Sequence, residues 1–237
     1  MCIECGCGQQ PHEKHDHPHR VVSVHESIFA DNDRRAERNR GYFRAHGLFV
    51  VNLVSSPGAG KTALLEKTLG LLPLRSGVVV GDLETDLDAI RLRKTGTSVV
   101  QVATGTLCHL DAAMVARAVG TLNVKALAVL FIENVGNLVC PAAFDLGEDL
   151  RVTLLSVPEG EDKPLKYPPL FRSSNWVVVT KIDLEEACGF DREACLGHLG
   201  RVAPKARILE LSSKTGAGMD QWCDELVQAY ESRGKGL

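Results

Sequence analysis

A glycine-rich run follows an apolar segment and precedes a helical pattern: Ser55-Ser56-Pro57-Gly58-Ala59-Gly60-Lys61-Thr62. Backbone N–H groups of such a loop point at phosphate oxygens, and the helix N-terminus adds a favourable dipole. Lys61 would reach the β and γ phosphates of a nucleotide, and the Thr62 hydroxyl would ligate magnesium. Although Ser55 stands where the consensus motif has glycine, the strand–loop–helix context predicts a phosphate site. Its residues would be Gly58, Ala59, Gly60, Lys61, Thr62 and Ala63.

Acidic residues follow two predicted strands at the same edge of the sheet. Glu133 opens the run Glu133-Asn134-Val135-Gly136, at the place where nucleotide hydrolases of this type carry Asp-x-x-Gly. Glu133 would hold magnesium through water or position the attacking water, and the Gly136 N–H would sense the γ-phosphate. Asp82 ends an earlier strand and is a second candidate for magnesium, with a helix cap as its structural alternative. We therefore assign catalysis to Lys61, Glu133 and Asp82. No Gln follows Gly136 and no arginine finger is identifiable, which predicts slow intrinsic hydrolysis that a partner or dimerisation accelerates.

Two later motifs predict which base is bound. Thr180-Lys181-Ile182-Asp183 follows a strand directly and corresponds to Asn-Lys-x-Asp of GTPases, with Thr180 replacing Asn. The Asp183 carboxylate can accept two hydrogen bonds from guanine, which adenine cannot supply, and a buried acceptor left unpaired costs about 1–3 kcal/mol. After the last predicted strand, Ser213 and Lys214 belong to a loop of the kind that closes over the base. Together these motifs favour GTP over ATP.

Three cysteines fall within the first seven residues, at Cys2, Cys5 and Cys7, with glycines that permit a tight wrap. Three thiolates and the terminal amine can form a near-planar nickel(II) site or a tetrahedral zinc site. The sequence does not distinguish these geometries, and a disordered tail with idle cysteines is the alternative. The histidines that follow would collect metal or form a charged linker. They are His12, His15, His17 and His19.

A second candidate metal site combines Cys108 and His109 with Cys140. The first two precede a predicted helix, and Cys140 follows the Glu133 segment, so we expect all three at the ligand-binding end of the sheet. Three protein ligands leave a position for water or for a second subunit. A metal ion that bridges two subunits would link metal occupancy, dimerisation and nucleotide state.

The predicted architecture is α/β, a P-loop NTPase with a mostly parallel sheet of about seven strands and helices on both faces, because apolar runs alternate with helical patterns. Strands are predicted at 48–54, 78–80, 99–102, 127–132, 152–157, 176–179 and 208–211, and helices include 61–72, 109–121 and 216–231. The stretch 158–173 contains four prolines and is predicted to be a long, mobile loop.

Composition divides the chain into a flexible Cys/His metal-binding arm at 1–24, a charged N-terminal helix at 25–46, and a P-loop GTPase domain at 47–237. The arm has too few apolar side chains to offset its ordering entropy. A net charge of −3 predicts no nucleic-acid partner. Because no apolar run is long enough to span a membrane and no secretory signal is recognised, we expect a cytoplasmic protein with reduced cysteines and no membrane contact.

The motifs together resemble the HypB family of hydrogenase maturation GTPases, which incorporate nickel. The resemblance covers nearly the whole chain and rests on MCIECGCG, NDRRAERNRGYFRAHG, NLVSSPGAGKT, GDLETDLDAIRL, TGTLCHLDA, ENVGNLVCPA, TKIDL and SSKTGAGMDQW. It implies a high-affinity nickel site in the arm, at Cys2, Cys5 and Cys7. It also implies a nickel or zinc site in the domain, at Cys108, His109 and Cys140. It further implies a homodimer formed on GTP or metal binding, a small zinc-containing nickel chaperone as partner, and the hydrogenase large-subunit precursor as recipient.

The predicted function is therefore a GTP-hydrolysing nickel metallochaperone for nickel–iron hydrogenase that uses GTP with Mg²⁺, Ni²⁺ and, at the domain site, Zn²⁺. One alternative is the urease accessory GTPase, which typically carries Cys-Pro-His where this chain has Leu107-Cys108-His109. The other is a nickel store in which GTP binding is vestigial, against which the intact Lys61 and Asp183 argue.

Overall fold

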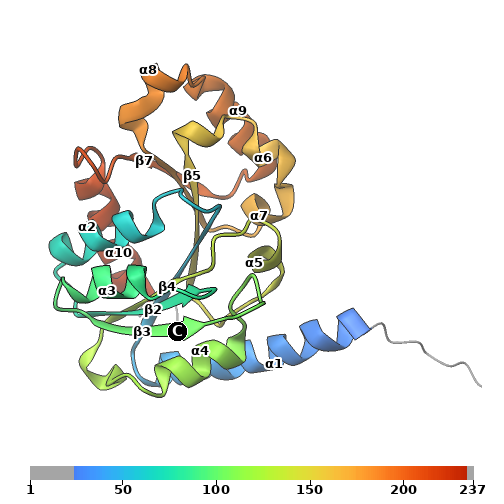
Figure 1. Ribbon diagram of the computed structural model, residues 1–237, viewed down its shortest axis with the longest axis vertical. Helices are drawn as coiled ribbons and strands as arrows, with labels where there is room; N and C mark the ends of the chain where they lie inside the picture. Colours follow the sequence, from blue (N-terminus) through green and yellow to red (C-terminus); the bar gives the residue numbers. More distant parts are fainter. Residues whose placement is uncertain (1–23, 234–237) are drawn as a thin grey trace, which may run out of the picture.

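The computed structural model describes residues 24–233, and side chains from residue 28 onward. Its seven-stranded sheet has the order β3-β2-β4-β1-β5-β6-β7, and every neighbouring pair is parallel (Figure 1). The strands are β1 Phe49–Ser55, β2 Ser76–Asp82, β3 Ser98–Ala103, β4 Val129–Glu133, β5 Leu150–Ser156, β6 Trp176–Thr180 and β7 Arg207–Leu211. The α/β class and the parallel sheet that the sequence predicts are confirmed.

Helices cover both faces of the sheet because successive residues of a strand point to opposite sides. Val51 and Leu53 of β1 belong to one core cluster, with the helices α2 and α10, whereas Val50 lies in a second cluster with α1 and α4. The central strands β1, β4, β5 and β6 are buried along their whole length, which explains their continuous apolar sequence. The longer helices are α1 Val24–Ala45, α2 Lys61–Leu71, α3 Leu87–Arg93, α4 Ala112–Val119, α9 Arg192–Val202 and α10 Met219–Ser232.

The prediction of a long, mobile loop at 158–173 is wrong. This stretch begins in the 3-10 turn η2 Val157–Glu159 and forms two short helices, α6 Lys163–Lys166 and α7 Pro168–Arg172. Prolines lie in the first turn of each element, where a helix has no use for the missing N–H donor, so they start helices here instead of breaking them. Leu170 and Phe171 are buried and fix the segment to the core.

Two buried asparagines fix α1 to the domain, next to α4 (Figure 1). Asn39 donates to the carbonyl oxygens of Ala112 and Leu146, at 2.8 and 3.0 Å. Asn32 donates to the Asp145 carbonyl at 2.8 Å and accepts from the Ala112 N–H at 3.0 Å. Helix α1 is therefore bound both to the start of α4 and to the segment that follows α5 (Cys140–Ala143).

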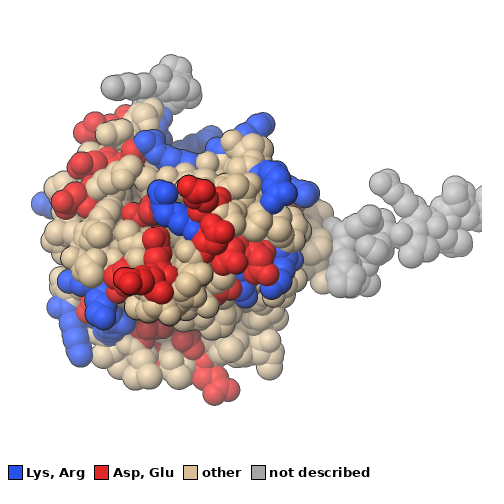
Figure 2. All heavy atoms as spheres, turned by 90° about the horizontal axis from the view of Figure 1, so that it is seen from above, with Lys and Arg blue, Asp and Glu red and all other residues tan. Residues whose placement is uncertain are grey.

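Acidic and basic side chains are interspersed on the face of the molecule shown in Figure 2, in keeping with the small net charge. Among residues 24–233, no helix combines the length and the apolar character that crossing a membrane would require.

Candidate nucleotide and metal sites

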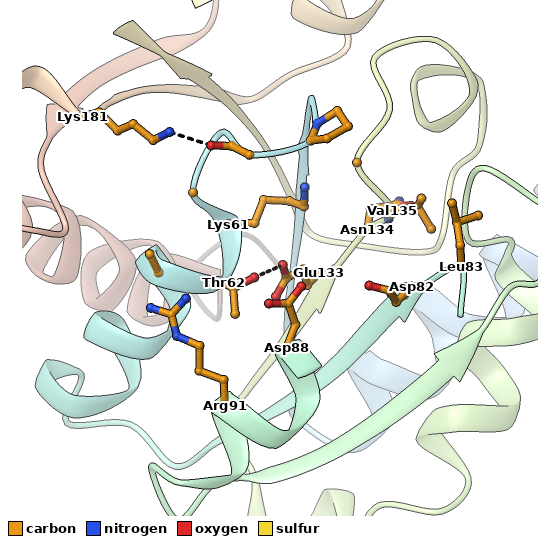
Figure 3. A pocket seen from close by; sticks show the side chains of 16 residues that line it. Lys61, Thr62, Asp82, Leu83, Asp88, Arg91, Glu133, Asn134, Val135 and Lys181 are labelled. Carbon is orange, nitrogen blue, oxygen red and sulfur yellow. Dashed lines mark hydrogen bonds between the residues drawn. The ribbon is translucent and has the colours of Figure 1, made fainter. Parts of the chain in front are cut away.

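A cavity of about 550 Å³ opens at the carboxyl ends of β1, β2 and β4 (Figure 3). The glycine-rich loop between β1 and α2 forms one wall, and Gly58 and Gly60 have positive φ angles of 74° and 100° that L side chains rarely adopt. The cavity lining brings together most of the residues that the sequence predicts for phosphate and magnesium, namely Gly58, Gly60, Lys61, Thr62, Ala63, Asp82, Glu133 and Gly136. Ala59 is buried behind the loop and lines the neighbouring base cavity instead.

Thr62 and Glu133 meet in this cavity, where the Thr62 hydroxyl donates to Glu133 Oε1 at 2.6 Å (Figure 3). The other carboxylate oxygen, Oε2, is buried and has no hydrogen-bond partner among the described residues. Burial raises the pKa of Glu133 to about 7, against the opposing effects of the Thr62 hydrogen bond and the Lys61 charge. A hydroxyl beside an orphaned carboxylate oxygen fits the oxygen ligands that Mg²⁺ prefers.

Lys61 is buried and its ammonium group donates to Ser55 Oγ at 3.0 Å. Burial lowers the pKa of Lys61, and the Glu133 charge opposes this effect. A desolvated ammonium group has a strong electrostatic preference for an anion, which the phosphates of a nucleotide would supply. Ser55, the departure from the consensus motif, thus holds Lys61 in place, a role that sequence reasoning did not anticipate.

The helix α3 adds two cavity residues that sequence reasoning missed. The Asp88 carboxylate lies beside Glu133 and also raises the pKa of Glu133 (Figure 3). Arg91 lines the cavity too, but its Nε donates to Glu66 Oε2 at 2.8 Å. The signal that could have identified both is their position in the helix after β2, whose N-terminus faces the carboxyl edge of the sheet.

Asp82 does not cap the following helix, whose N-cap residue is Asp86, and its role as a magnesium ligand stays a prediction. It lines the cavity at the end of β2, and its Oδ1 also accepts from the backbone N–H groups of Glu84 and Thr85, each at 3.1 Å. These bonds orient the Asp82 carboxylate at the edge of the cavity and fix the turn before α3.

A second cavity of about 200 Å³ adjoins the glycine-rich loop at the ends of β6 and β7. Thr180 donates from its hydroxyl to the Ala59 carbonyl at 2.7 Å, so the residue that replaces Asn still ties this motif to the phosphate loop. Lys181 extends over the loop, donates to the Gly58 carbonyl at 2.6 Å, and is the only non-glycine residue with positive φ in the described part of the chain. The predicted base-binding residues line this cavity: Thr180, Lys181, Asp183, Ser213 and Lys214.

Asp183 is exposed in the structure and is held by Ser212, whose buried hydroxyl donates to Asp183 Oδ1 at 2.5 Å. Sequence reasoning singled out Ser213 and Lys214 but missed Ser212, which is the residue that donates to the Asp183 carboxylate. The exposure of Asp183 leaves its acceptor positions accessible to a base that enters the cavity.

Cys108, His109 and Cys140 form a cluster, with one donor atom of each within 4.8 Å of the others. The Cys108 thiol donates to the Cys140 sulfur at 2.8 Å, and both cysteines are free. His109 Nδ1 is buried and has no hydrogen-bond partner among residues 24–233, while the imidazole ring stacks on Phe144 at 3.9 Å between centroids. An imidazole beside two thiol sulfurs is a donor set suited to a borderline-soft metal ion.

The pKa shifts of His109 and Cys140 act on metal binding in opposite directions. Burial lowers the pKa of His109, which keeps the imidazole neutral and able to coordinate. The pKa of Cys140 is raised, first by the hydrogen bond with Cys108 and second by burial. Its thiol therefore keeps its proton until a cation binds beside it and stabilises the thiolate. The cysteines Cys2, Cys5 and Cys7 and the histidines at 12–19 lie outside the described residues.

Comparison with known proteins places this geometry among relatives. The family model described as the CobW/HypB/UreG nucleotide-binding domain matches residues 49–210. Hydrogenase maturation factor HypB of Azotobacter chroococcum mcd 1 is 52% identical over 207 residues, which cover 86% of this chain and 67% of that protein. The crystal structure of HypB from Helicobacter pylori in complex with nickel has a TM-score of 0.84 at 38% identity, over 86% of this chain and 96% of that one. HypB from Archaeoglobus fulgidus has a TM-score of 0.80 at 38% identity, over 85% and 99%.

Proposed function

Because the chain belongs to the HypB family of hydrogenase maturation factors, within the CobW/HypB/UreG nucleotide-binding domains, we propose that it is a GTP-hydrolysing nickel metallochaperone. It would bind nickel and help to insert it into nickel–iron hydrogenase, with its GTP state coupled to dimerisation and metal binding. One observation carries this proposal: Cys140 of the Cys108–His109–Cys140 cluster ends the segment 133–140, which also contains Glu133 and Gly136 of the phosphate cavity. The nickel complex of the Helicobacter pylori relative supports nickel as the cargo.

The nucleotide half of the proposal assigns each group by its position in the cavity. Lys61 would exchange its Ser55 partner for the β and γ phosphates, because a buried ammonium gains more from an anion than from a hydroxyl. Thr62 and Glu133 would hold magnesium, whose charge neutralises the phosphates in the transition state. The Gly136 N–H would sense the γ-phosphate, and Asp183, held by Ser212, would accept from guanine.

Slow intrinsic hydrolysis is part of this proposal. Glu133 either ligates magnesium or positions the attacking water, and Asp82 is the second acid within the cavity. Arg91 is the one arginine that lines the cavity, but it is bound to Glu66 on α2. Hydrolysis would accelerate when a partner or a second copy of the chain supplies a cation to the transition state, or releases Arg91 from Glu66 so that Arg91 can act there.

The metal half of the proposal treats nickel as substrate and the cluster as its transient holder. Cys108, His109 and Cys140 supply three donors, and zinc would compete for the same set. A second copy of the chain would complete the coordination sphere, so metal binding would favour the homodimer. The arm cysteines Cys2, Cys5 and Cys7 would form a separate, tighter nickel site, loaded in the cytoplasm with the help of a small zinc-containing chaperone.

Single-turnover hydrolysis of GTP and ATP tests the enzymatic claim. The Lys61→Ala variant should lose GTP hydrolysis, because no other buried cation faces the phosphate cavity among the described residues. The exposed Lys125→Ala serves as the matched control and should hydrolyse GTP like the unmodified chain. A nickel store with vestigial GTP binding would show no difference between the two variants and would overturn the proposal.

Complementation separates the hydrogenase role from the urease role. In a host that lacks its own factor, the chain should restore nickel-dependent hydrogenase activity, and Cys140→Ala should lower that restoration. Restoration of urease but not hydrogenase would instead support the urease accessory function.

A further inference from the structure

The segment 134–139, which we name the linking loop, joins β4 to Cys140 and contacts the two sites at once. On its nucleotide side, Val135 and Gly136 line the phosphate cavity. Gly136 packs so closely on the phosphate loop that an added Cβ would lie 2.9 Å from Pro57 Cα and 3.0 Å from Pro57 N. On its other side the linking loop ends at a donor of the metal cluster, so its position bears on both ligands.

Two asparagine side chains of the linking loop bind the backbone on either side of His109. Asn134 Oδ1 accepts from the Leu110 N–H at 3.1 Å, and Asn137 Nδ2 donates to the Cys108 carbonyl at 3.3 Å. Asn134 is buried, with 1% of its surface exposed. The segment that carries two metal donors is therefore attached to the loop that leads to the third donor.

The asparagines are also fixed within their own surroundings. Asn134 Oδ1 accepts a second bond, from the Val135 N–H at 3.0 Å, and Asn137 Oδ1 accepts from the Val139 N–H at 2.8 Å. Asn134 Nδ2 donates to Asn52 Oδ1 at 3.4 Å, so both ends of each side chain are hydrogen-bonded. Such a side chain transmits a displacement instead of absorbing it, because breaking its hydrogen bonds leaves polar groups unsatisfied. Movement of the linking loop should then carry Cys108 and His109 along with Cys140.

We propose that Asn134 and Asn137 are the positioning residues that couple nucleotide state to the geometry of the Cys108–His109–Cys140 cluster. Engagement of the γ-phosphate by the Gly136 N–H, with magnesium held by Glu133, would reset the linking loop, and the two asparagines would pass that change to His109. Without them, Cys140 would still move through its covalent connection, but the other two donors would not follow. This inference rests on the proposed function and names the regulation of the same site.

A purely structural role predicts a different outcome. If the asparagines only stabilise the fold, their loss lowers nickel affinity by the same factor with GDP and with a GTP analogue. If they couple the sites, their loss changes the ratio of the two affinities. The ratio is therefore the decisive quantity, since a coupling free energy is a difference between states.

The experiment uses the full chain with Cys2, Cys5 and Cys7 replaced by Ser and with His12, His15, His17 and His19 replaced by Ala, so that the domain site alone reports. Ni²⁺ is titrated in competition with a chromophoric chelator, once with Mg²⁺–GDP and once with a non-hydrolysable GTP analogue and Mg²⁺. The unmodified domain should show an affinity ratio of about 5–150-fold, the usual range of allosteric coupling. Nickel should change the affinity for the GTP analogue relative to GDP by the same factor, because linkage is reciprocal.

Asn134→Ala and Asn137→Ala should each bring that ratio to within about twofold of unity, by the loss of one bridging bond to the Cys108–Leu110 segment. Asn137→Asp keeps the acceptor for the Val139 N–H and replaces the donor to Cys108 by a charged oxygen. Asn137→Ala removes the same donor without adding charge, so the same loss of the ratio in both variants excludes an effect of the charge. If Asn134→Ala fails to fold, the two variants of the half-buried Asn137 decide the question.

Two control variants account for generic effects. Asn123→Ala removes an exposed asparagine whose side chain caps no helix. Thr153→Val removes a buried hydroxyl that is 2.6 Å from Ser174 Oγ, and so matches the loss of a buried hydrogen bond outside the linking loop and the Cys108–Leu110 segment. Both controls should keep the full ratio.

The outcomes separate the inference from the proposed function. If the asparagine variants keep the unmodified ratio while nickel still responds to nucleotide, the inference is overturned and the proposed function stands. If the unmodified domain binds no nickel, or binds it equally in both states, the proposed coupling fails and the inference fails with it.

Discussion

The raised pKa of Glu133 predicts that this one carboxylate makes the nucleotide-free protein less stable as pH rises. Burial raises the pKa from 4.5 to about 7. Between those values the folded state keeps a proton that the unfolded state loses, so the free energy of unfolding falls as pH increases and levels off above pH 7. At about 1.4 kcal/mol per pH unit, the total decrease is about 3 kcal/mol.

Glu133→Gln removes this titration and keeps an oxygen that can accept from the Thr62 hydroxyl. The variant carries a pH-independent offset, because its new N–H₂ group occupies the place of the unpartnered Oε2. Relative to the unmodified protein, its free energy of unfolding should therefore rise by about 3 kcal/mol from about pH 4.5 to about pH 8. The charged groups that act on Glu133 are Lys61, Asp88 and Arg91, and the substitution retains all of them.

Urea unfolding of both proteins at several pH values, without nucleotide and with a metal chelator present, measures this difference. The exposed Glu186→Gln is the control for the exchange of a carboxylate for an amide at a solvated position. Addition of a Mg²⁺–nucleotide complex should reverse the order of stability above pH 7, since the ionised carboxylate then has a cation. A stability difference for Glu133→Gln that is constant from about pH 4.5 to about pH 8 would refute the reasoning.

Three further substitutions give shorter tests. Gly136→Ala should lower the free energy of unfolding by about 1–3 kcal/mol, since its Cβ would lie 2.9 Å from Pro57 Cα. If the variant binds the GTP analogue as tightly as the unmodified protein does, and likewise GDP, the proposed γ-phosphate contact is contradicted. Asp183→Ala should weaken GTP binding by about 10–100-fold without affecting ATP, the effect of about 1–3 kcal/mol for a lost base contact, and calorimetry showing equal losses for both nucleotides would count against guanine recognition. In a chain with Cys2, Cys5 and Cys7 replaced by Ser, Cys140→Ala should lower the nickel stoichiometry and the sulfur-to-nickel charge-transfer absorption. The exposed Cys188→Ala should change neither. An unchanged nickel stoichiometry in Cys140→Ala would show that Cys140 is not a metal ligand.

The sheet could be predicted from the sequence because its central strands are buried on both faces and read as continuous apolar runs. The phosphate loop could be predicted because its chemistry is local to one short run. The helices of 158–173 could not, because prolines signal either a break or a first helical turn, and the choice depends on tertiary burial of Leu170 and Phe171.

The same limit applies to the site. That Cys108, His109 and Cys140 lie at one edge follows from the topology of parallel strands. The contacts that orient these residues are long-range and involve common polar side chains, as in the bond between Asn134 and the Leu110 N–H. Nothing in the local pattern distinguishes such an asparagine, or Ser212 beside Asp183, from a polar residue on a solvated loop.

The central claim is that one nickel ion binds to Cys108, His109 and Cys140, of which Cys140 ends the segment that contains the phosphate-sensing groups. Anomalous diffraction at the nickel edge tests it most directly, on crystals grown with Ni²⁺, Mg²⁺ and a non-hydrolysable GTP analogue. The account predicts an anomalous peak bonded to Cys108, His109 and Cys140, with a second copy of the chain or a water completing the coordination. A domain with the analogue in its cavity, those three donors uncoordinated and the nickel bound elsewhere would contradict it.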